Sequence, residues 1–158
     1  MFEDSEEPRE GLPRNLDDSV KKYREVLRKG KADELRHALS HDALETLIQY
    51  CLESNKYDDA LAFATMYAEF APFSSEAWHK KALALAGMRR FSEALDCYAL
   101  AISIAPVDAD LLVNYGVAMD QCGRHDEAMA MLDRALECEP GHEDALYNKA
   151  VLCEQRGL

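Results

Sequence analysis

The chain has 158 residues, of which 48% are hydrophobic and 30% are charged, a composition typical of a globular protein. Its 30 Asp and Glu residues against 18 Lys and Arg give a net charge of −12, which argues against non-specific binding to nucleic acid or to an anionic membrane. Its apolar runs are far shorter than the roughly 20 residues that a membrane helix needs. The N-terminus lacks the basic start and apolar core of a secretory signal. We therefore expect a cytoplasmic protein.

The N-terminal part of the chain divides into a tail and a helical segment. Residues 1–16 are rich in acids and contain two prolines, so we interpret them as a disordered acidic tail. Apolar side chains then recur at helical spacing, which predicts an N-terminal helical cap over residues 17–40. Asp17 or Asp18 would cap its first helix and Gly30 would end it, before a second short helix. This segment has seven Lys or Arg residues against five acids, so a short basic docking helix is the alternative to a cap.

From residue 41 onward the sequence repeats itself at the constant interval that separates Pro72 from Pro106 and Pro106 from Pro140. Six columns carry the period: Pro72, Pro106 and Pro140; Ala60, Ala94 and Ala128; Leu44, Trp78, Leu112 and Leu146; Ile48, Ala82, Gly116 and Ala150; Tyr57, Phe91 and His125; and the acids Asp59, Glu93 and Glu127 before each alanine of the second column. A fixed period of this length is typical of a stacked array of supersecondary units.

Each unit is predicted to form two helices joined by a short turn. In the second unit, apolar residues follow helical spacing over residues 77–85 and again over 94–102, with residues 87–90 as the turn between them. Gly123 occupies the corresponding turn of the third unit. The proline of each unit would end the second helix, because it lacks an N–H and restricts the residue before it. The columns of small residues would let two helices cross closely.

This pattern resembles the tetratricopeptide repeat (TPR) family, whose repeating unit of the same length is a helix–turn–helix with six preferred packing positions. The residues that carry the resemblance are Leu44, Ile48, Ala60, Ala64, Tyr67 and Pro72 in the first unit, Trp78, Ala82, Ala94, Tyr98, Ala101 and Pro106 in the second, Leu112, Gly116, Ala128, Leu132, Ala135 and Pro140 in the third, and Leu146 and Ala150 in the fourth. The first unit departs from the pattern at Ile48, Ala64 and Tyr67, so its helices are expected to pack more loosely or in a shifted way.

The resemblance implies an all-α fold, a right-handed α-α superhelix of about three and a half helix–turn–helix repeats. The implied units are 41–74, 75–108 and 109–142, followed by 143–158 as the first helix of a fourth repeat or as a capping helix. That last helix carries Tyr147, Val151 and Leu152, which make it rather apolar for a cap. We therefore expect the natural protein to extend beyond this chain.

The sequence contains no catalytic motif, because a Gly-rich phosphate loop, an HExxH pair and a nucleophile elbow are all absent. Its five histidines and five cysteines are scattered over different units without ligand spacing. The cysteines are interpreted as reduced packing residues of a reducing compartment. The sequence thus predicts a protein that is not an enzyme and that holds no cofactor and no metal.

The resemblance implies that the first helix of each unit lines a concave groove. The candidate partner-binding residues, chosen by the face on which they lie, are Glu45, Gln49, His79, Leu83, Asp110, Val113, Val117, Asp120, Tyr147 and Val151. An apolar strip from Leu83 to Val151 runs between acids, which is typical of a contact surface. The alternative is that these side chains pack against the neighbouring repeat or against a continuation of the chain.

Chaperone-binding members of the family hold acidic peptide tails with Lys, Arg and Asn side chains in the groove. The matching positions here hold Glu45, Gln49, Lys80, Asp110 and Asn114 in one register, and His79, Leu83, Asn114, Asp144 and Asn148 in the other. Acids stand where cations are needed, so an acidic tail would be repelled. We therefore expect a protein–protein interaction module, a scaffold or adaptor, that binds a peptide or helix with apolar anchors and basic flanks. The alternatives are a scaffold that self-assembles through its terminal repeats, and the TPR segment of a larger enzyme or secretion-type chaperone.

Overall fold

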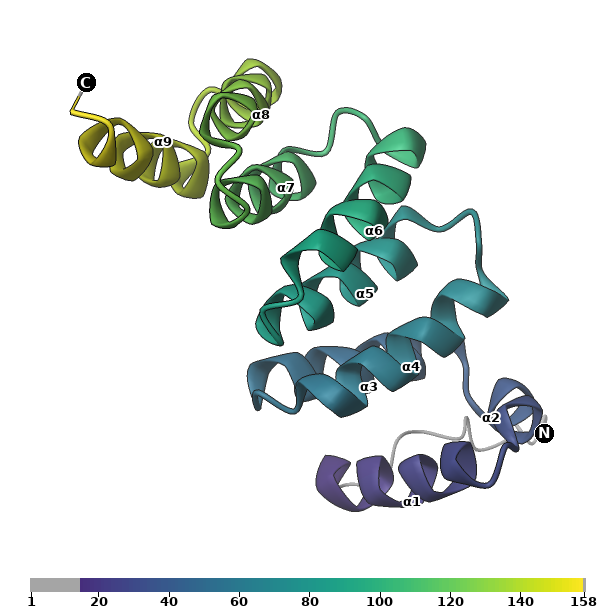
Figure 1. The fold of residues 1–158 in the computed structure, drawn as a ribbon. Helices are drawn as coiled ribbons and strands as arrows, with labels where there is room; N and C mark the ends of the chain where they lie inside the picture. Colours follow the sequence, from purple (N-terminus) through teal and green to yellow (C-terminus); the bar gives the residue numbers. More distant parts are fainter. Residues whose placement is uncertain (1–14, 158) are drawn as a thin grey trace, which may run out of the picture.

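The computed structural model describes residues 15–157, and over that range the regular structure is entirely α-helical (Figure 1). Its helices are α1 (Leu16–Arg28), α2 (Ala32–Ala38), α3 (His41–Glu53), α4 (Tyr57–Phe70), α5 (Ser75–Gly87), α6 (Phe91–Ile104), α7 (Ala109–Gln121), α8 (His125–Cys138) and α9 (Glu143–Gln155). Successive helix pairs stack into an elongated, curved array with α1 at one end and α9 at the other. The predicted all-α superhelix is confirmed. The expected acidic tail falls almost wholly on residues 1–14, outside the described residues.

The start of α1 differs from the prediction. Its N-cap is Asn15, whose side chain accepts a hydrogen bond from the backbone N–H of Asp17 at 3.0 Å. Asp17 and Asp18, the predicted caps, lie instead in the first turn of the helix, where their charges complement the positive end of the helix dipole. Gly30 follows the helix in the left-handed conformation (φ +71°), as predicted for its end.

Ion pairs and apolar packing attach α1 to the first repeat. Two nitrogens of the Arg24 guanidinium donate to the two carboxylate oxygens of Asp59 on α4, and Asp59 is buried. Lys56, just before α4, donates to Asp17. Val20 is buried in the same core cluster as the first repeat. Because a buried carboxylate left without its cation is costly, this contact specifies where α1 lies.

The period of the sequence reappears in the caps of the first helices. The residues that cap α3, α5, α7 and α9 by accepting a backbone N–H with their side chains are Ser40, Ser74, Asp108 and His142. The residues that follow these helices with positive φ are Asn55, Arg89, Gly123 and Gly157. After the first three of them, the backbone N–H of the next residue donates a hydrogen bond to a carbonyl oxygen of the helix, that of Cys51, Leu85 or Met119. These bonds satisfy carbonyl groups that would otherwise lack a partner. Each first helix is therefore bounded at both ends by local chemistry.

The columns of small residues mark the closest helix approaches. Ala60, Ala94 and Ala128 all have no exposed surface. A Cβ added to Gly116 on α7 would lie 3.2 Å from the carbonyl oxygen of Ala128 on α8, closer than ordinary packing allows. The repeat therefore depends on a small side chain at this crossing, as predicted from the sequence.

The first repeat packs less extensively than the others. α3 and α4 contact each other over less of their length than do α5 and α6 or α7 and α8. This agrees with the expectation from its departures at Ile48, Ala64 and Tyr67, although all three are buried. Leu61 and Trp78 pack against both core clusters and so connect the N-terminal and C-terminal halves of the core.

We predict that Ala94→Leu destabilises the protein by about 1–3 kcal/mol, because three further carbon atoms must enter a crossing that has no free surface. The measurement is the free energy of unfolding in urea. The matched control is Ala99→Leu, an exposed position on the same helix, which should change stability by less than about 0.5 kcal/mol. Equal effects of the two substitutions would show that the crossing tolerates volume.

Candidate partner-binding groove

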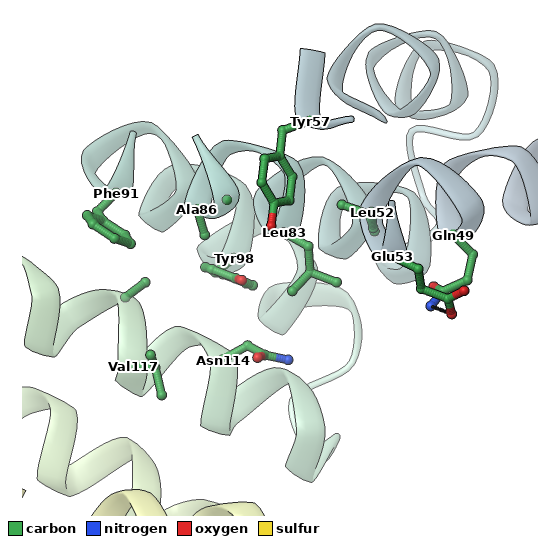
Figure 2. Close-up of a pocket in the computed structure, with 12 residues that line it drawn as sticks. Gln49, Leu52, Glu53, Tyr57, Leu83, Ala86, Phe91, Tyr98, Asn114 and Val117 are labelled. Carbon is green, nitrogen blue, oxygen red and sulfur yellow. Dashed lines mark hydrogen bonds between the residues drawn. The ribbon is translucent and has the colours of Figure 1, made fainter. Parts of the chain in front are cut away.

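The first helices α3, α5 and α7 lie side by side and leave a pocket of about 420 Å³ on their shared face, here called the groove pocket (Figure 2). Its lining residues are Gln49, Leu52, Glu53, Tyr57, Leu83, Ala86, Gly87, Phe91, Tyr98, Asn114, Val117 and Ala118. Most of these side chains are apolar, and the polar ones are few, which is the usual make-up of a binding pocket. Figure 2 shows Leu83 and Tyr98 across from Asn114 and Val117.

The pocket is open because two positions at the end of α5 are small. Both Ala86 and Gly87 line it, and a larger side chain in place of Ala86 would take up part of its space. A Cβ on Gly87 would lie 2.3 Å from the ring of Tyr57, so that ring rests directly on the glycine backbone. The Tyr57 hydroxyl donates to the Asn55 side chain at 2.6 Å, which orients the ring as one wall of the pocket.

The structure distributes the predicted groove residues over three neighbouring depressions. Gln49, Leu83 and Val117 line the groove pocket. Glu45 and Gln49 line a hollow of about 390 Å³ toward α1. Val117, Asp120 and Val151 line a smaller hollow of about 120 Å³ between α7, α8 and α9. Tyr147 lines none of the three and is 69% exposed on α9.

One predicted groove residue, Val113, is instead part of the core. It is 4% exposed and belongs to the cluster that joins α5 to α9. The physical reason is that α7 packs against α5, α6, α8 and α9. Neighbouring helices therefore cover more of its surface than they would on a helix that packs on one side only. The apolar strip on the exposed groove surface is therefore interrupted at this position.

The groove is predominantly acidic toward α3. Gln49 donates to Glu53 at 2.7 Å and accepts from Lys80 at 2.6 Å, while Lys80 also pairs with Glu76 at 3.2 Å. Glu45 accepts from the Tyr67 hydroxyl, and burial raises the pKa of Tyr67 to about 12, so the hydroxyl keeps its proton and donates. The one cation among the residues that line this hollow, Lys80, is thus paired with a carboxylate. The surrounding acids make the electrostatic potential of the hollow negative.

Two further predicted acids are paired with histidines. Asp110 on α7 accepts from Nε2 of His142 at 2.9 Å, because the other ring nitrogen of His142 caps α9 by accepting from the backbone N–H of Ala145. Asp120 lies 2.6 Å from Nδ1 of His125, across the turn between α7 and α8. Both acids are therefore paired within the scaffold, and of the two only Asp110 has a largely exposed side chain (77%, against 22% for Asp120).

His79 lies behind the pocket rather than on its rim. Its Nε2 is 3.1 Å from Nδ2 of Asn114, and its ring is near that of Tyr98, with centroids 6.0 Å apart. Burial lowers the pKa of His79 and outweighs the nearby carboxylates, which act in the opposite sense. The neutral ring therefore accepts a hydrogen bond from the Asn114 amide. That bond holds Asn114 in place in the pocket.

Several lining residues are absent from the predicted set. Asn114, Tyr98, Tyr57 and Phe91 all line the pocket. The repeat pattern assigns Tyr98 a packing role, and it places Tyr57 and Phe91 in one column without linking that column to the groove. The signal that could have found Tyr57, Phe91 and Tyr98 is their large aromatic size in units that also carry the small Ala86 and Gly87, and Asn114 stands at a groove position in the comparison with chaperone-binding members.

In the part of the chain that the structure describes, no helix is long and apolar enough to cross a membrane. Over the same residues, no group of three or more His, Cys, Asp or Glu side chains is arranged to hold a metal ion. All five cysteines are free thiols, and Cys51 and Cys97 are buried.

Comparison with known proteins identifies the family. Two family models of the tetratricopeptide repeat match residues 14–75 and 85–152. The chain belongs to the tetratricopeptide repeat family. Superkiller protein 3 of Saccharomyces cerevisiae is 28% identical over 87 residues, which are 53% of this chain but 6% of the yeast protein. The chain therefore spans only a small part of that relative.

Solved structures share the fold. The crystal structure of MamA superposes with a TM-score of 0.73 at 22% identity, covering 90% of this chain and 80% of MamA. YrrB, described as a TPR protein with an unusual peptide-binding site, gives 0.67 at 24% identity, covering 85% of this chain and 68% of YrrB. The first TPR domain of Spaghetti (RPAP3), bound to the HSP90 peptide SRMEEVD, gives 0.68 at 20% identity, covering 73% of this chain and 91% of that domain.

We predict that His79 makes stability pH-dependent. Its pKa is lowered from about 6.5 in the folded state, so the unfolded chain takes up its proton first as the pH falls. The stability that neutral His79 contributes is present above about pH 6.5 and is lost as the pH falls below that value toward the lowered pKa. Urea unfolding from about pH 7.5 to about pH 5 should show a steeper loss for the wild type than for His79→Gln. Parallel pH profiles would contradict the assignment.

Proposed function

We propose that this chain is a non-catalytic interaction module, a scaffold or adaptor, that binds a peptide or helix of a partner protein along the face of α3, α5 and α7. The fold supports a protein-interaction role in general. The observation that carries the specific proposal is the groove pocket, which combines apolar walls from three helices with a polar rim. The free thiols support a reducing compartment such as the cytoplasm.

The pocket chemistry favours an apolar anchor next to a basic residue. Leu83 and Val117 offer apolar surface on opposite sides, so burial of one aliphatic or aromatic side chain between them would supply most of the affinity. Glu53 stands at the rim and belongs also to the acidic hollow toward α1. A Lys or Arg beside the anchor would meet this carboxylate, which adds specificity and speed of association more than affinity.

The acidity of the groove separates this chain from relatives that bind chaperone tails. The first TPR domain of Spaghetti and the second of human RPAP3 bind the peptides SRMEEVD and SGPTIEEVD, both acidic at the C-terminus. Here Glu45, Glu53 and Glu76 surround the single Lys80 of the hollow. Such a tail would meet like charges, so a cationic partner is favoured.

We predict that a displayed library of random peptides, selected on the wild-type protein, yields sequences with an apolar anchor and at least one Lys or Arg nearby. Val117→Asp should weaken binding of a selected peptide at least about tenfold at any ionic strength, because it places a charge against the anchor. The measurement is a fluorescence-anisotropy titration at low and at high salt.

Charge variants test the second half of the proposal. Glu53→Lys should weaken the same peptide mainly at low salt, because the attraction it reverses is screened at high salt. Asp96→Lys, an equal charge change at an exposed position on α6, is the matched control and should leave binding unchanged. Selection of acidic peptides, or wild-type affinity in Val117→Asp, would place the working surface elsewhere.

A further inference from the structure

The groove pocket differs from the matching hollow in the next repeat by its aromatic walls. Tyr57, at the start of α4, and Phe91 and Tyr98, on α6, line the groove pocket (Figure 2). The hollow between α7, α8 and α9 is lined by many of the counterparts of this set one repeat further along, but by no aromatic side chain among the described residues. Leu132 stands there in place of Tyr98. The rings are therefore a property of this pocket and not of the repeat in general.

The rings of the pocket are held in place before any partner arrives. The Arg89 guanidinium lies 5.7 Å from the centre of the Phe91 ring. The rings of Tyr98 and Tyr115 have their centroids 6.1 Å apart, and the Tyr57 ring is fixed by its own hydrogen bond. Flat walls that are already ordered favour a flat side chain between them, because aromatic rings pack in offset or edge-to-face pairs and little further ordering is needed.

One polar atom of the pocket wall is left open. Asn114 lines the pocket, but its Nδ2 lies 3.1 Å from Nε2 of His79, which is not among the lining residues. Because the amide nitrogen is turned toward His79, the carbonyl oxygen Oδ1 is left on the side of the pocket. None of the described residues donates to that oxygen, and no buried polar side-chain atom among them lacks a partner, so Oδ1 is accessible. Gln49, in contrast, has both ends of its amide bonded to Glu53 and Lys80.

The next repeat shows that the histidine sets this orientation. Asn148 stands at the position of Asn114, but Val113 stands at the position of His79. Without a histidine partner, Nδ2 of Asn148 donates to the backbone carbonyl oxygen of Asp144 on its own helix, at 2.7 Å. His79 therefore draws the Asn114 amide into the one orientation that offers an acceptor to the pocket.

We propose that the groove pocket takes an aromatic side chain that carries its own hydrogen-bond donor, the indole N–H of Trp or the hydroxyl of Tyr, and that this donor binds Oδ1 of Asn114. The inference rests on the proposed function, because it names the anchor of the same partner. Trp and Tyr join an apolar ring to one polar tip, which matches aromatic walls with one open acceptor. His79 is a positioning residue that acts through Asn114.

The donor provides specificity as well as affinity. A Leu or Phe anchor would fill the same space but would cover the Asn114 oxygen without giving it a partner. A polar group that is buried unpaired loses its hydrogen bonds to water and gains nothing in return. A site of this kind rejects the analogue that lacks the donor more strongly than a purely apolar site rejects a change of shape.

The test is a double-mutant cycle between peptide and protein. Peptides selected on the wild type from the random library should be enriched in Trp or Tyr at the anchor position. In each selected peptide the anchor is then replaced by an isostere without the donor, benzothienylalanine for Trp and Phe for Tyr. Fluorescence anisotropy measures the Kd of both peptides for the wild type, for Asn114→Leu and for His79→Leu, and circular dichroism verifies that the variants fold.

Loss of the donor should weaken binding to the wild type by about fivefold or more, and this comparison needs no variant protein. The Trp and Tyr pairs show which of the two donors the pocket takes. The same loss should have no effect on binding to Asn114→Leu, which has no acceptor. In His79→Leu the amide is free to rotate, so the effect should shrink to less than about twofold while the donor-free peptide keeps its affinity.

Equal affinity of the two peptides for the wild type, or a donor effect that persists in Asn114→Leu, would overturn this inference. Val117→Asp then distinguishes the two levels of the account. If it still weakens the selected peptides, the groove remains the binding surface and only the choice of anchor is wrong. If it binds them like the wild type, the proposed function fails as well.

Discussion

The close crossing of the two helices within each repeat is the contact on which the rest of the structure depends. At this crossing, Ala94 and its equivalents have no exposed surface, and a Cβ on Gly116 would lie 3.2 Å from the carbonyl oxygen of Ala128, which is tighter than most such contacts. A side chain that small brings the backbones together, so the larger residues around it must fill defined spaces. Because a similar crossing recurs along the array, although the first repeat packs less extensively, the repeats stack into a curve that presents their first helices along one face.

Caps and turns give this packing its register. Side-chain N-caps such as Ser74 and Asp108 begin the first helices, and left-handed residues such as Arg89 and Gly123 end them. The groove pocket is a consequence of these boundaries, since Gly87 at the end of α5 makes room for the Tyr57 ring. A surface that binds a partner thus arises from the residues that end a helix.

The helix pairs and their order could be predicted from the sequence, because the repeated columns consist of core residues whose packing is local. The groove could be predicted only in part. Val113 is buried because α7 touches four other helices, and no pattern within one helix shows this. Asn114 and Tyr98 line the pocket because separate helices bring them together, and Asn15 caps α1 just before the aspartates predicted for that role. These are outcomes of tertiary geometry or of competition between nearby caps.

The most direct test of the groove pocket as the binding surface is methyl NMR of the protein titrated with a selected apolar–basic peptide. The side chains of Leu52, Leu83 and Val117 line the groove pocket, whereas Leu100 and Ile104 are exposed on α6. Binding in the groove pocket predicts large, saturable shifts for the methyl signals of the first three and none for the other two. Shifts confined to Leu100 and Ile104, with the pocket signals unchanged, would contradict it.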